Sequence, residues 1–273
     1  MGKFSGILIC TDLDGTLFRD DKTISEENKS ATEYFMSEGG YFTFVTGRMP
    51  YYATSAYEAV GPNAPFGCIN GGGLYDGKRG EYVWSCTLPD EITEIVDLIE
   101  DRFPDVGIHP CCLDKVYCTA ENRVTRAFRR ITGLPKIECA YRDIQTPVAQ
   151  IILGIDSEAV IEAVTGMLKE HPLFPLYDVI RSEQTLLQIQ PKGINKGNSI
   201  IKLSEHLGIS PDKTIAVGDY DNDVGMLRTA KLGIAVANAS HAAKAAADLI
   251  TVSNEQHAIA QIIHDIENGK IVI

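Results

Sequence analysis

The sequence predicts an α/β fold in which a parallel sheet is interrupted by an inserted α+β domain. In the first and last thirds of the chain, short apolar runs alternate with amphipathic stretches, which is the pattern of βαβ units. The middle third instead holds candidate strand pairs joined by short polar turns, which favour an antiparallel sheet with helices on one face. We therefore expect the outer thirds to build one core at 1–85 and 191–273, and residues 86–190 to form an inserted second domain.

The first third opens with a run at 6–12 that is too apolar for a strand with one exposed face. A helix is expected from Ser25, a suitable N-cap followed by two acidic residues, and it should end at Gly39. Strands are then expected at 41–47 and 66–70, and a helix at 50–60. The last third repeats the alternation, with helices expected at 196–207, 222–230 and 255–267 and strands at 214–219 and 232–237.

The middle third has its own expected elements. Apolar residues recur on one face of a helix expected near 90–102. The other expected elements are a helix at 158–170 and strands at 115–119, 148–155, 177–181 and 185–190. Four arginines are expected on a solvated helix face, with contact to a second anionic group of a substrate as the alternative: Arg123, Arg126, Arg129 and Arg130.

The composition excludes several classes of partner. Of 273 residues, 44% are hydrophobic and 23% charged, as in a folded globular protein. The net charge of −12, from 25 Lys and Arg against 37 Asp and Glu, argues against nucleic acid or an anionic membrane surface. No apolar run reaches the length of about 18 residues that spans a bilayer, and no signal peptide is evident. We expect a cytoplasmic protein that is a monomer or weak homodimer.

The seven cysteines are expected to be reduced. None belongs to a C-x-x-C pair, and no histidine lies at zinc-finger spacing. They are interpreted mainly as small buried hydrophobic residues. His109, Cys111 and Cys112 lie together in the middle third and are expected at buried or turn positions, with contact to substrate as the alternative.

Polar side chains follow the apolar runs of the outer thirds, where the expected strands end. They are Thr11, Asp12, Asp14 and Thr16 after the first run, Thr46, Gly47 and Arg48 after the second, Asn70 after the third, and Asp219, Asp221, Asn222 and Asp223 in the last third. Ligands of open parallel sheets bind at the carboxyl ends of the strands. We therefore expect these groups to meet at one edge of the sheet and to form the functional site.

Several carboxylates at one sheet edge require a cation among them. Oxygen ligands without His or thiolate suit a hard cation, and Mg²⁺ needs only one or two carboxylates because it keeps several waters. Lys196, at the start of an expected helix, adds fixed positive charge, while Thr46 and the Gly47 amide add hydrogen-bond donors. This combination is typical of a site for a phosphate bridged to Mg²⁺.

Four motifs in a fixed order carry a family resemblance. The tripeptide DLD alone is common, but the string ILICTDLDGTLF, followed by FVTGR, NKG and IAVGDYDND, is far more specific. Together the four motifs resemble those of the haloacid dehalogenase-like (HAD) phosphatases, and their order resembles the Cof-type branch, which has a large insert between motifs two and three. The resemblance implies a Rossmann-like core, an inserted cap that acts as a lid and selects the substrate, and small phosphorylated metabolites as substrates. These include sugar phosphates and flavin or pyridoxal-type phosphates.

The resemblance also implies a role for each motif residue. Asp12 would be the nucleophile that forms an aspartyl-phosphate and a Mg²⁺ ligand. Asp14 would be the general acid and base, and its main-chain carbonyl would also bind the metal, as would Asp219. The remaining residues would serve the phosphate or the ligands: Thr46, the Gly47 amide, Lys196 and Asn222 would contact or orient the phosphate, and Asp223 would support the metal ligands without binding the ion.

The two acids of the first motif are expected to differ in protonation. Metal coordination keeps Asp12 ionised, and Lys196 lowers its repulsion with an incoming phosphate dianion. Asp14, whose side chain is expected to face away from the metal, should be protonated more easily. One carboxylate can then attack while the other transfers protons.

Some interpretations stay open at this point. Arg48 is either a phosphate contact or part of a salt bridge, and the glycine-rich turn after Asn70 either supplies an amide to the leaving group or is a hairpin turn. A receiver-like phosphoacceptor module shares the Asp, Thr, Lys and Mg²⁺ but lacks the second acid. A phosphohexomutase shares the whole core and differs only in returning the phosphate to the sugar.

Overall fold

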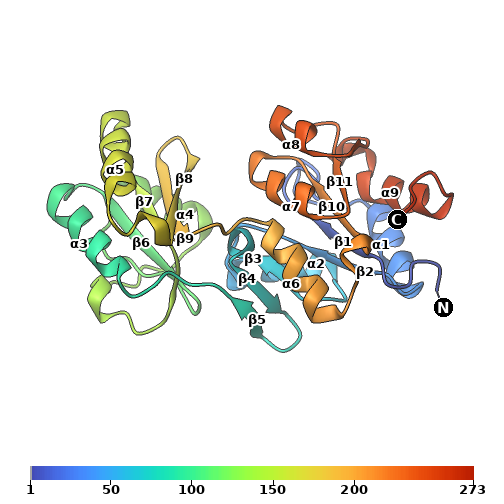
Figure 1. Ribbon diagram of the computed structural model, residues 1–273, viewed down its shortest axis with the longest axis horizontal. Helices are drawn as coiled ribbons and strands as arrows, with labels where there is room; N and C mark the ends of the chain where they lie inside the picture. The colour runs from blue at the N-terminus through green and yellow to red at the C-terminus, as the bar shows by residue number, and fades with distance from the viewer. Residues whose placement is uncertain (1) are drawn as a thin grey trace. The chain divides into compact units, whose positions relative to one another are not determined.

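A computed structural model describes residues 2–273, which divide into two compact units. The insert unit is Cys86–Ile194, and the core unit comprises the described residues on either side of it. In Figure 1 the blue and the red ends of the chain both belong to the core unit, while the insert unit is green to yellow. The second boundary lies at 194, four positions beyond the 190 expected from the sequence.

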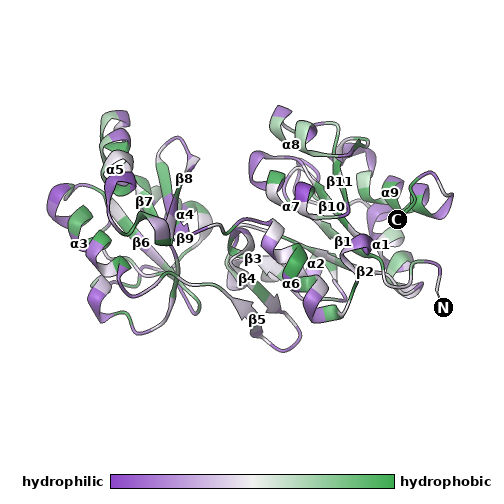
Figure 2. Cartoon of the chain, in the orientation of Figure 1, coloured by the Kyte–Doolittle hydropathy of each residue, from purple (hydrophilic) through white to green (hydrophobic). Residues whose placement is uncertain are grey.

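The core unit is built on a parallel sheet with the strand order β12-β11-β10-β1-β2. Its strands are β1 (Leu8–Thr11), β2 (Tyr41–Phe44), β10 (Thr214–Gly218), β11 (Leu232–Ala235) and β12 (Leu249–Ile250). The central strands β1 and β10 pair in register from Leu8 opposite Thr214 and are buried along their whole length. Figure 2 shows β1 and β11 coloured as apolar, which is expected of strands covered on both faces by helices.

Two helix ends of the core unit lie at residue types that favour such ends. Ser25 caps α1, since its Oγ accepts a hydrogen bond from the Asn28 amide at 3.2 Å, and Gly208 ends α6 in the left-handed conformation with φ 66°. The α-helices are α1 (Glu26–Ser37), α2 (Thr54–Val60), α6 (Gly197–Leu207), α7 (Val224–Thr229), α8 (His241–Ala246) and α9 (Ala258–Glu267). Short 3₁₀ segments cover Pro50–Tyr52, Ile69–Gly71, Pro211–Lys213, Asp221–Asp223 and Asn254–Gln256. Helix α1 packs against α9, and α6 against α7.

The predicted strand at 66–70 is shorter than expected and belongs to a second sheet. Strands β3 (Phe66–Cys68), β4 (Gly73–Asp76) and β5 (Glu81–Ser85) form an antiparallel sheet, and an isolated parallel bridge joins Val45 to Gly67. The chain turns because Ile69 and Asn70 have positive φ, 53° and 49°. The glycine-rich segment after Asn70 is therefore the turn of a hairpin that leads into β4.

The insert unit contains an antiparallel sheet with the strand order β6-β7-β9-β8. The strands are β6 (Gly107–Cys112), β7 (Val148–Gly154), β8 (Tyr177–Glu183) and β9 (Leu186–Pro191); the helices are α3 (Ile92–Arg102), α4 (Arg123–Thr132) and α5 (Glu158–Glu170), with 3₁₀ segments at Tyr141–Asp143 and Phe174–Leu176. The predicted α/β fold with an inserted α+β domain is confirmed. The predicted strand at 115–119 is wrong, because this segment makes only isolated bridges beside β6, the strand that pairs continuously with β7.

The two faces of the insert sheet differ in polarity. Ile108, Cys112 and Ile151 belong to the apolar cluster that packs with α3 and α5. The alternating positions His109 and Gln150 are buried but lie outside that cluster. Helix α4 packs on β6 and β7, where Gly107 and Gly154 leave room for Thr125. The insert sheet therefore has one apolar face and one face with buried polar groups.

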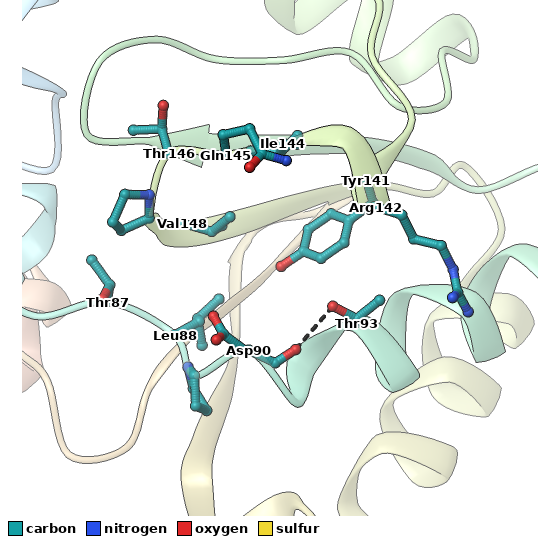
Figure 3. A pocket seen from close by; sticks show the side chains of 12 residues that line it. Thr87, Leu88, Asp90, Thr93, Tyr141, Arg142, Ile144, Gln145, Thr146 and Val148 are labelled. Atoms are coloured by element: carbon teal, nitrogen blue, oxygen red, sulfur yellow. Dashed lines mark hydrogen bonds between the residues drawn. The ribbon is translucent and has the colours of Figure 1, made fainter.

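The insert unit also contains a pocket of about 360 Å³ (Figure 3). It is bounded by the segment before α3 and by residues 141–148, and its lining includes Asp90, Tyr141 and Gln145. The Thr93 hydroxyl donates a hydrogen bond to the Asp90 carbonyl at 2.9 Å, which fixes one wall of this pocket. Among residues 2–273, no helix is long and apolar enough to cross a membrane.

Candidate active site

Three carboxylates meet at the carboxyl ends of β1 and β10. Asp12 follows β1, whereas Asp219 and Asp223 follow β10, and their carboxylate oxygens lie within 4.8 Å of one another. They meet because β1 and β10 are parallel neighbours, and the Asp12 amide continues the pairing by donating to the Val217 carbonyl at 2.8 Å. We call these three residues the acidic cluster. The position of the acidic cluster agrees with the expectation that polar residues after the strands meet at one edge of the sheet.

Lys196 is the buried counterion of the acidic cluster. Its side chain is 2% exposed, and its Nζ donates to Oδ1 of Asp12 and to Oδ1 of Asp223, both at 2.6 Å. The other oxygen of Asp223 accepts from the amides of Asp219 at 2.9 Å and Tyr220 at 3.0 Å. A buried ammonium is tolerated when it is paired in this way. Lys196 and Asp223 therefore fix both the nucleophile candidate and the loop after β10.

The acidic cluster has more negative than positive charge. Burial, together with the carboxylates of Asp223 and Asp219, raises the pKa of Asp12 to about 7, although Lys196 opposes this shift. Burial also raises the pKa of Asp219 above its ordinary value. Burial alone would lower the pKa of Lys196, but Asp12 and Asp223 raise it, so the ammonium stays charged. Three carboxylates around one ammonium, with only oxygen donors, fit a divalent hard cation such as Mg²⁺.

Asp14 points to two basic residues instead of the acidic cluster. Its Oδ1 accepts from Lys22 Nζ at 2.9 Å, and its Oδ2 from Arg48 Nη2 at 2.7 Å. Burial alone would raise the pKa of Asp14, but the hydrogen bonds and charges of Lys22 and Arg48 lower it below its ordinary value. These contacts favour ionised Asp14. The expectation that Asp14 is protonated more easily than Asp12 applies with a cation bound at Asp12, and it stays a prediction. Of the two interpretations of Arg48, the structure shows the salt bridge.

The other expected phosphate ligands meet around Asn70. Thr46 follows β2 and is 4% exposed, and its carbonyl accepts from the Asn70 amide at 3.1 Å. A Cβ at Gly47 would lie 2.8 Å from Oδ1 of Asn70, so a side chain would crowd this position. The exposed Asn222 donates from Nδ2 to the same Oδ1 at 3.4 Å. Asn70 thus links motif two to motif four.

Three contacting residues were given no role from the sequence. The Thr16 hydroxyl donates to Oδ1 of Asp219 at 2.7 Å, and Lys22 binds Asp14. Asn238 donates to the Gly15 carbonyl at 2.8 Å, which holds the turn of the first motif. Thr16 was expected at this sheet edge with the other polar groups, although without an individual role, and its contact with Asp219 agrees with that expectation. Lys22 and Asn238 lie outside the strand-end motifs, and no sequence signal marked them.

The family assignment comes from a match along nearly the whole chain. The sequence model of the haloacid dehalogenase-like hydrolases matches residues 9–263, which include every residue of the acidic cluster and Lys196. The chain belongs to the haloacid dehalogenase-like hydrolases. This assignment confirms the predicted family.

Individual relatives and one solved structure are similar to this chain over nearly its whole length. The chain is 27% identical to the 5-amino-6-(5-phospho-D-ribitylamino)uracil phosphatase YitU of Bacillus subtilis, over 94% of this chain and 96% of the relative. It is 30% identical to the chloroplastic endoribonuclease YBEY of Arabidopsis thaliana, over 96% of this chain but only 46% of that protein. A haloacid dehalogenase-like hydrolase of Bacteroides thetaiotaomicron has a similar structure, with a TM-score of 0.81, 26% identity and coverage of 95% of this chain and 99% of that one. The predicted enzyme class, a HAD-type phosphatase, is confirmed.

Proposed function

We propose that this HAD-type phosphatase hydrolyses phosphomonoesters of small metabolites through an aspartyl-phosphate on Asp12, with Mg²⁺ as cofactor. The observation that carries the proposal is the position of Lys196, which binds Asp12 and Asp223 at 2.6 Å beside a third carboxylate. A lysine in this position orients one oxygen of Asp12 and compensates the charge of an incoming phosphate. A purely structural salt bridge would not require the third acid.

The residues proposed to hold Mg²⁺ are Asp12, Asp219 and the main-chain carbonyl of Asp14. The bound ion would keep Asp12 ionised and withdraw charge from the phosphoryl oxygens. Asp223, whose two oxygens are already engaged by Lys196 and by two amides, supports this set without joining it. Asp223 is fully buried, which agrees with a role in supporting the metal ligands without binding the ion.

The chain's own residues account for the chemical steps. A carboxylate oxygen of Asp12 attacks phosphorus, the bond from phosphorus to the leaving oxygen breaks, and Asp14 gives its proton to that oxygen. Asp14 then takes a proton from water as the water attacks phosphorus, the bond to Asp12 breaks, and inorganic phosphate leaves. Since Lys22 and Arg48 favour ionised Asp14 in the structure, the first step requires Asp14 to be protonated against these contacts.

The proposed substrates are sugar phosphates and similar small phosphorylated metabolites. The named substrate of YitU carries its phosphate on a ribityl chain, which supports this class for the present protein. We assign the choice of leaving group to the insert unit. The net charge of −12 keeps polyanions such as nucleic acid outside the proposed substrate range.

A screen of phosphorylated metabolites with Mg²⁺, ranked by kcat/KM, tests the proposal. Release of inorganic phosphate from several sugar phosphates is the expected result, with loss of activity after chelation and recovery with Mg²⁺. If no phosphomonoester, including a generic aryl phosphate, were hydrolysed, the proposal would be rejected. Accumulation of a sugar-phosphate isomer without free phosphate would instead identify a mutase. An aspartyl-phosphate that persists for minutes would identify a phosphoacceptor module.

A further inference from the structure

A second cluster of metal-ligating side chains lies in the insert unit. His109, Cys118 and Glu121 each offer one donor atom, and these atoms lie within 4.8 Å of one another. All three residues belong to the insert unit, so the cluster is separate from the carboxylates at the ends of β1 and β10. We call it the insert cluster. The mechanism proposed above uses none of its members.

The local fold brings the three residues together. His109 lies in the middle of β6, and the segment after β6 turns back along it. The amide of Tyr117 donates to the Pro110 carbonyl at 2.9 Å, and the amide of Thr119 to the Ile108 carbonyl at 3.0 Å. These bonds hold Cys118 beside His109. Glu121 lies three positions after Cys118, shortly before α4 begins.

His109 carries the independent observation that points to a ligand. It is 0% exposed, and neither of its ring nitrogens has a hydrogen-bond partner. Buried polar groups in folded proteins are nearly always satisfied, so an imidazole with two unpartnered nitrogens calls for an unseen partner. Burial also lowers the pKa of His109 to about 4, which keeps the imidazole neutral and able to donate a lone pair at neutral pH.

The donor set distinguishes among cations. A nitrogen, a sulfur and a carboxylate oxygen suit a borderline-soft divalent ion such as Zn²⁺, whereas Mg²⁺ and Ca²⁺ prefer oxygen alone. Tetrahedral Zn²⁺ places neighbouring ligand atoms about 3.5 Å apart, so donors within 4.8 Å need only small side-chain rotations. Three protein ligands leave one position for water, as in many zinc sites.

The positive charges around Glu121 limit the affinity of the insert cluster for a metal ion. Its Oε1 accepts from Arg129 at 2.8 Å, while its Oε2 lies 3.2 Å from Arg126 and 3.8 Å from Lys136. These cations keep the carboxylate ionised and oriented, because together they lower the pKa of Glu121 against the effect of burial. A metal ion would compete with the longer contacts at Oε2. Each carboxylate oxygen has a second lone pair, so the Arg129 contact can remain.

We propose that the insert unit binds one Zn²⁺ through His109, Cys118 and Glu121. On binding, the Cys118 thiol releases its proton to solvent, and the thiolate, the neutral imidazole and the carboxylate each donate an electron pair to the ion. The bound ion tethers the irregular segment 113–121 to β6. This site would stabilise the insert unit and takes no part in the chemistry at Asp12.

Cobalt titration of the full-length chain tests the proposal. The protein is stripped of metal with a chelator and titrated with CoCl₂ alone, and the sulfur-to-cobalt charge-transfer band is recorded, since the carboxylates of the acidic cluster cannot produce it. The expected result is a band that saturates once the insert cluster is filled and is lost when ZnCl₂ displaces the cobalt.

Matched variants assign the ligands. Cys118→Ser should abolish the band, and His109→Gln should weaken cobalt binding by more than about tenfold. Cys111→Ser, a buried cysteine on the same strand as His109, and Asp219→Asn, in the acidic cluster, should both keep the band. Circular dichroism confirms that each variant is folded, and the sulfur-to-cobalt band of the unmodified protein gives a readout that needs no variant. Absence of the band from the folded, unmodified protein, or its persistence in folded Cys118→Ser, would overturn the proposal.

Discussion

Lys196 in the core unit and His109 in the insert unit are both buried, but only one of them is satisfied by the chain itself. Lys196 has two carboxylate partners at 2.6 Å, and a third carboxylate lies within reach of the same cluster. His109 has no partner for either ring nitrogen. The two proposed cation sites therefore rest on different observations: a surplus of negative charge in the core unit, and unpartnered ring nitrogens in the insert unit.

In the core unit, the substitution with the largest expected effect is Asp12→Asn. If Asp12 is the nucleophile, the amide should reduce phosphatase kcat by about 10⁴-fold or more while the chain stays folded. Steady-state release of phosphate from an aryl phosphate measures the loss. Asp212→Asn, an exposed acid of the same unit, is the control and should retain full activity. Normal turnover by Asp12→Asn would exclude the proposed mechanism.

Asp14→Asn separates proton transfer from nucleophilic attack. Loss of a general acid and base typically reduces the rate by about 10²–10⁴-fold. The smallest loss is expected for substrates with good leaving groups, because an aryl oxide needs less protonation than a sugar alkoxide. The measurement is kcat for an aryl phosphate and for a sugar phosphate. An equal loss with both substrates would contradict the acid role of Asp14.

Lys196→Met tests whether the buried ammonium balances the acidic cluster. Removing one partner of a buried ion pair leaves unpaired carboxylates and should lower the free energy of unfolding by about 3–5 kcal/mol. Urea denaturation measures this change. Lys202→Met, in the helix α6 that follows Lys196 and paired with Glu205 nearer the surface, should change it by less than about 1 kcal/mol. Similar changes in the free energy of unfolding for the two substitutions would mean that the buried ion pairs of Lys196 stabilise the fold no more than an exposed pair does.

Arg48→Gln should change the pH dependence more than the maximal rate. Arg48 and Lys22 lower the pKa of Asp14, so removing Arg48 should raise that pKa toward its ordinary value. More Asp14 is then protonated at a given pH above the pKa, and the limb of the pH–rate profile that reports loss of this proton should move to higher pH. Profiles of kcat/KM for the variant and for the control Arg79→Gln measure the shift. A movement toward lower pH would show that Arg48 acts on another group.

Strand ends and helix ends were predictable because they depend on local rules. Asp12 and Asp219 had to converge once the apolar runs before them were assigned to one parallel sheet. Ser25 and Gly39 flank α1, and each residue type favours such a position through its own side chain or backbone geometry. The roles assigned to Thr46, Gly47 and Asn222 remain predictions.

Features that depend on tertiary contacts were not predictable. The salt bridges from Lys22 and Arg48 lower the pKa of Asp14, and nothing in the spacing of these residues indicated the two contacts. The segment 115–119 has strand-like residues, yet β6, one turn earlier, pairs with β7 in its place. The face that holds His109 was not predictable, because the sequence analysis expected no strand at Gly107–Cys112.

The separation of Asp12 and Lys196 along the chain has a consequence for biosynthesis. The two residues are 184 positions apart, and the whole insert unit lies between them. At about 5–20 residues per second, the ribosome adds Lys196 roughly 10–40 s after Asp12. During that time the insert unit is completed as one contiguous segment, while the first strand of the core still lacks both its buried counterion and the neighbouring strand β10. The order of synthesis therefore favours an insert unit that folds first and contacts between Asp12 and Lys196 that form last.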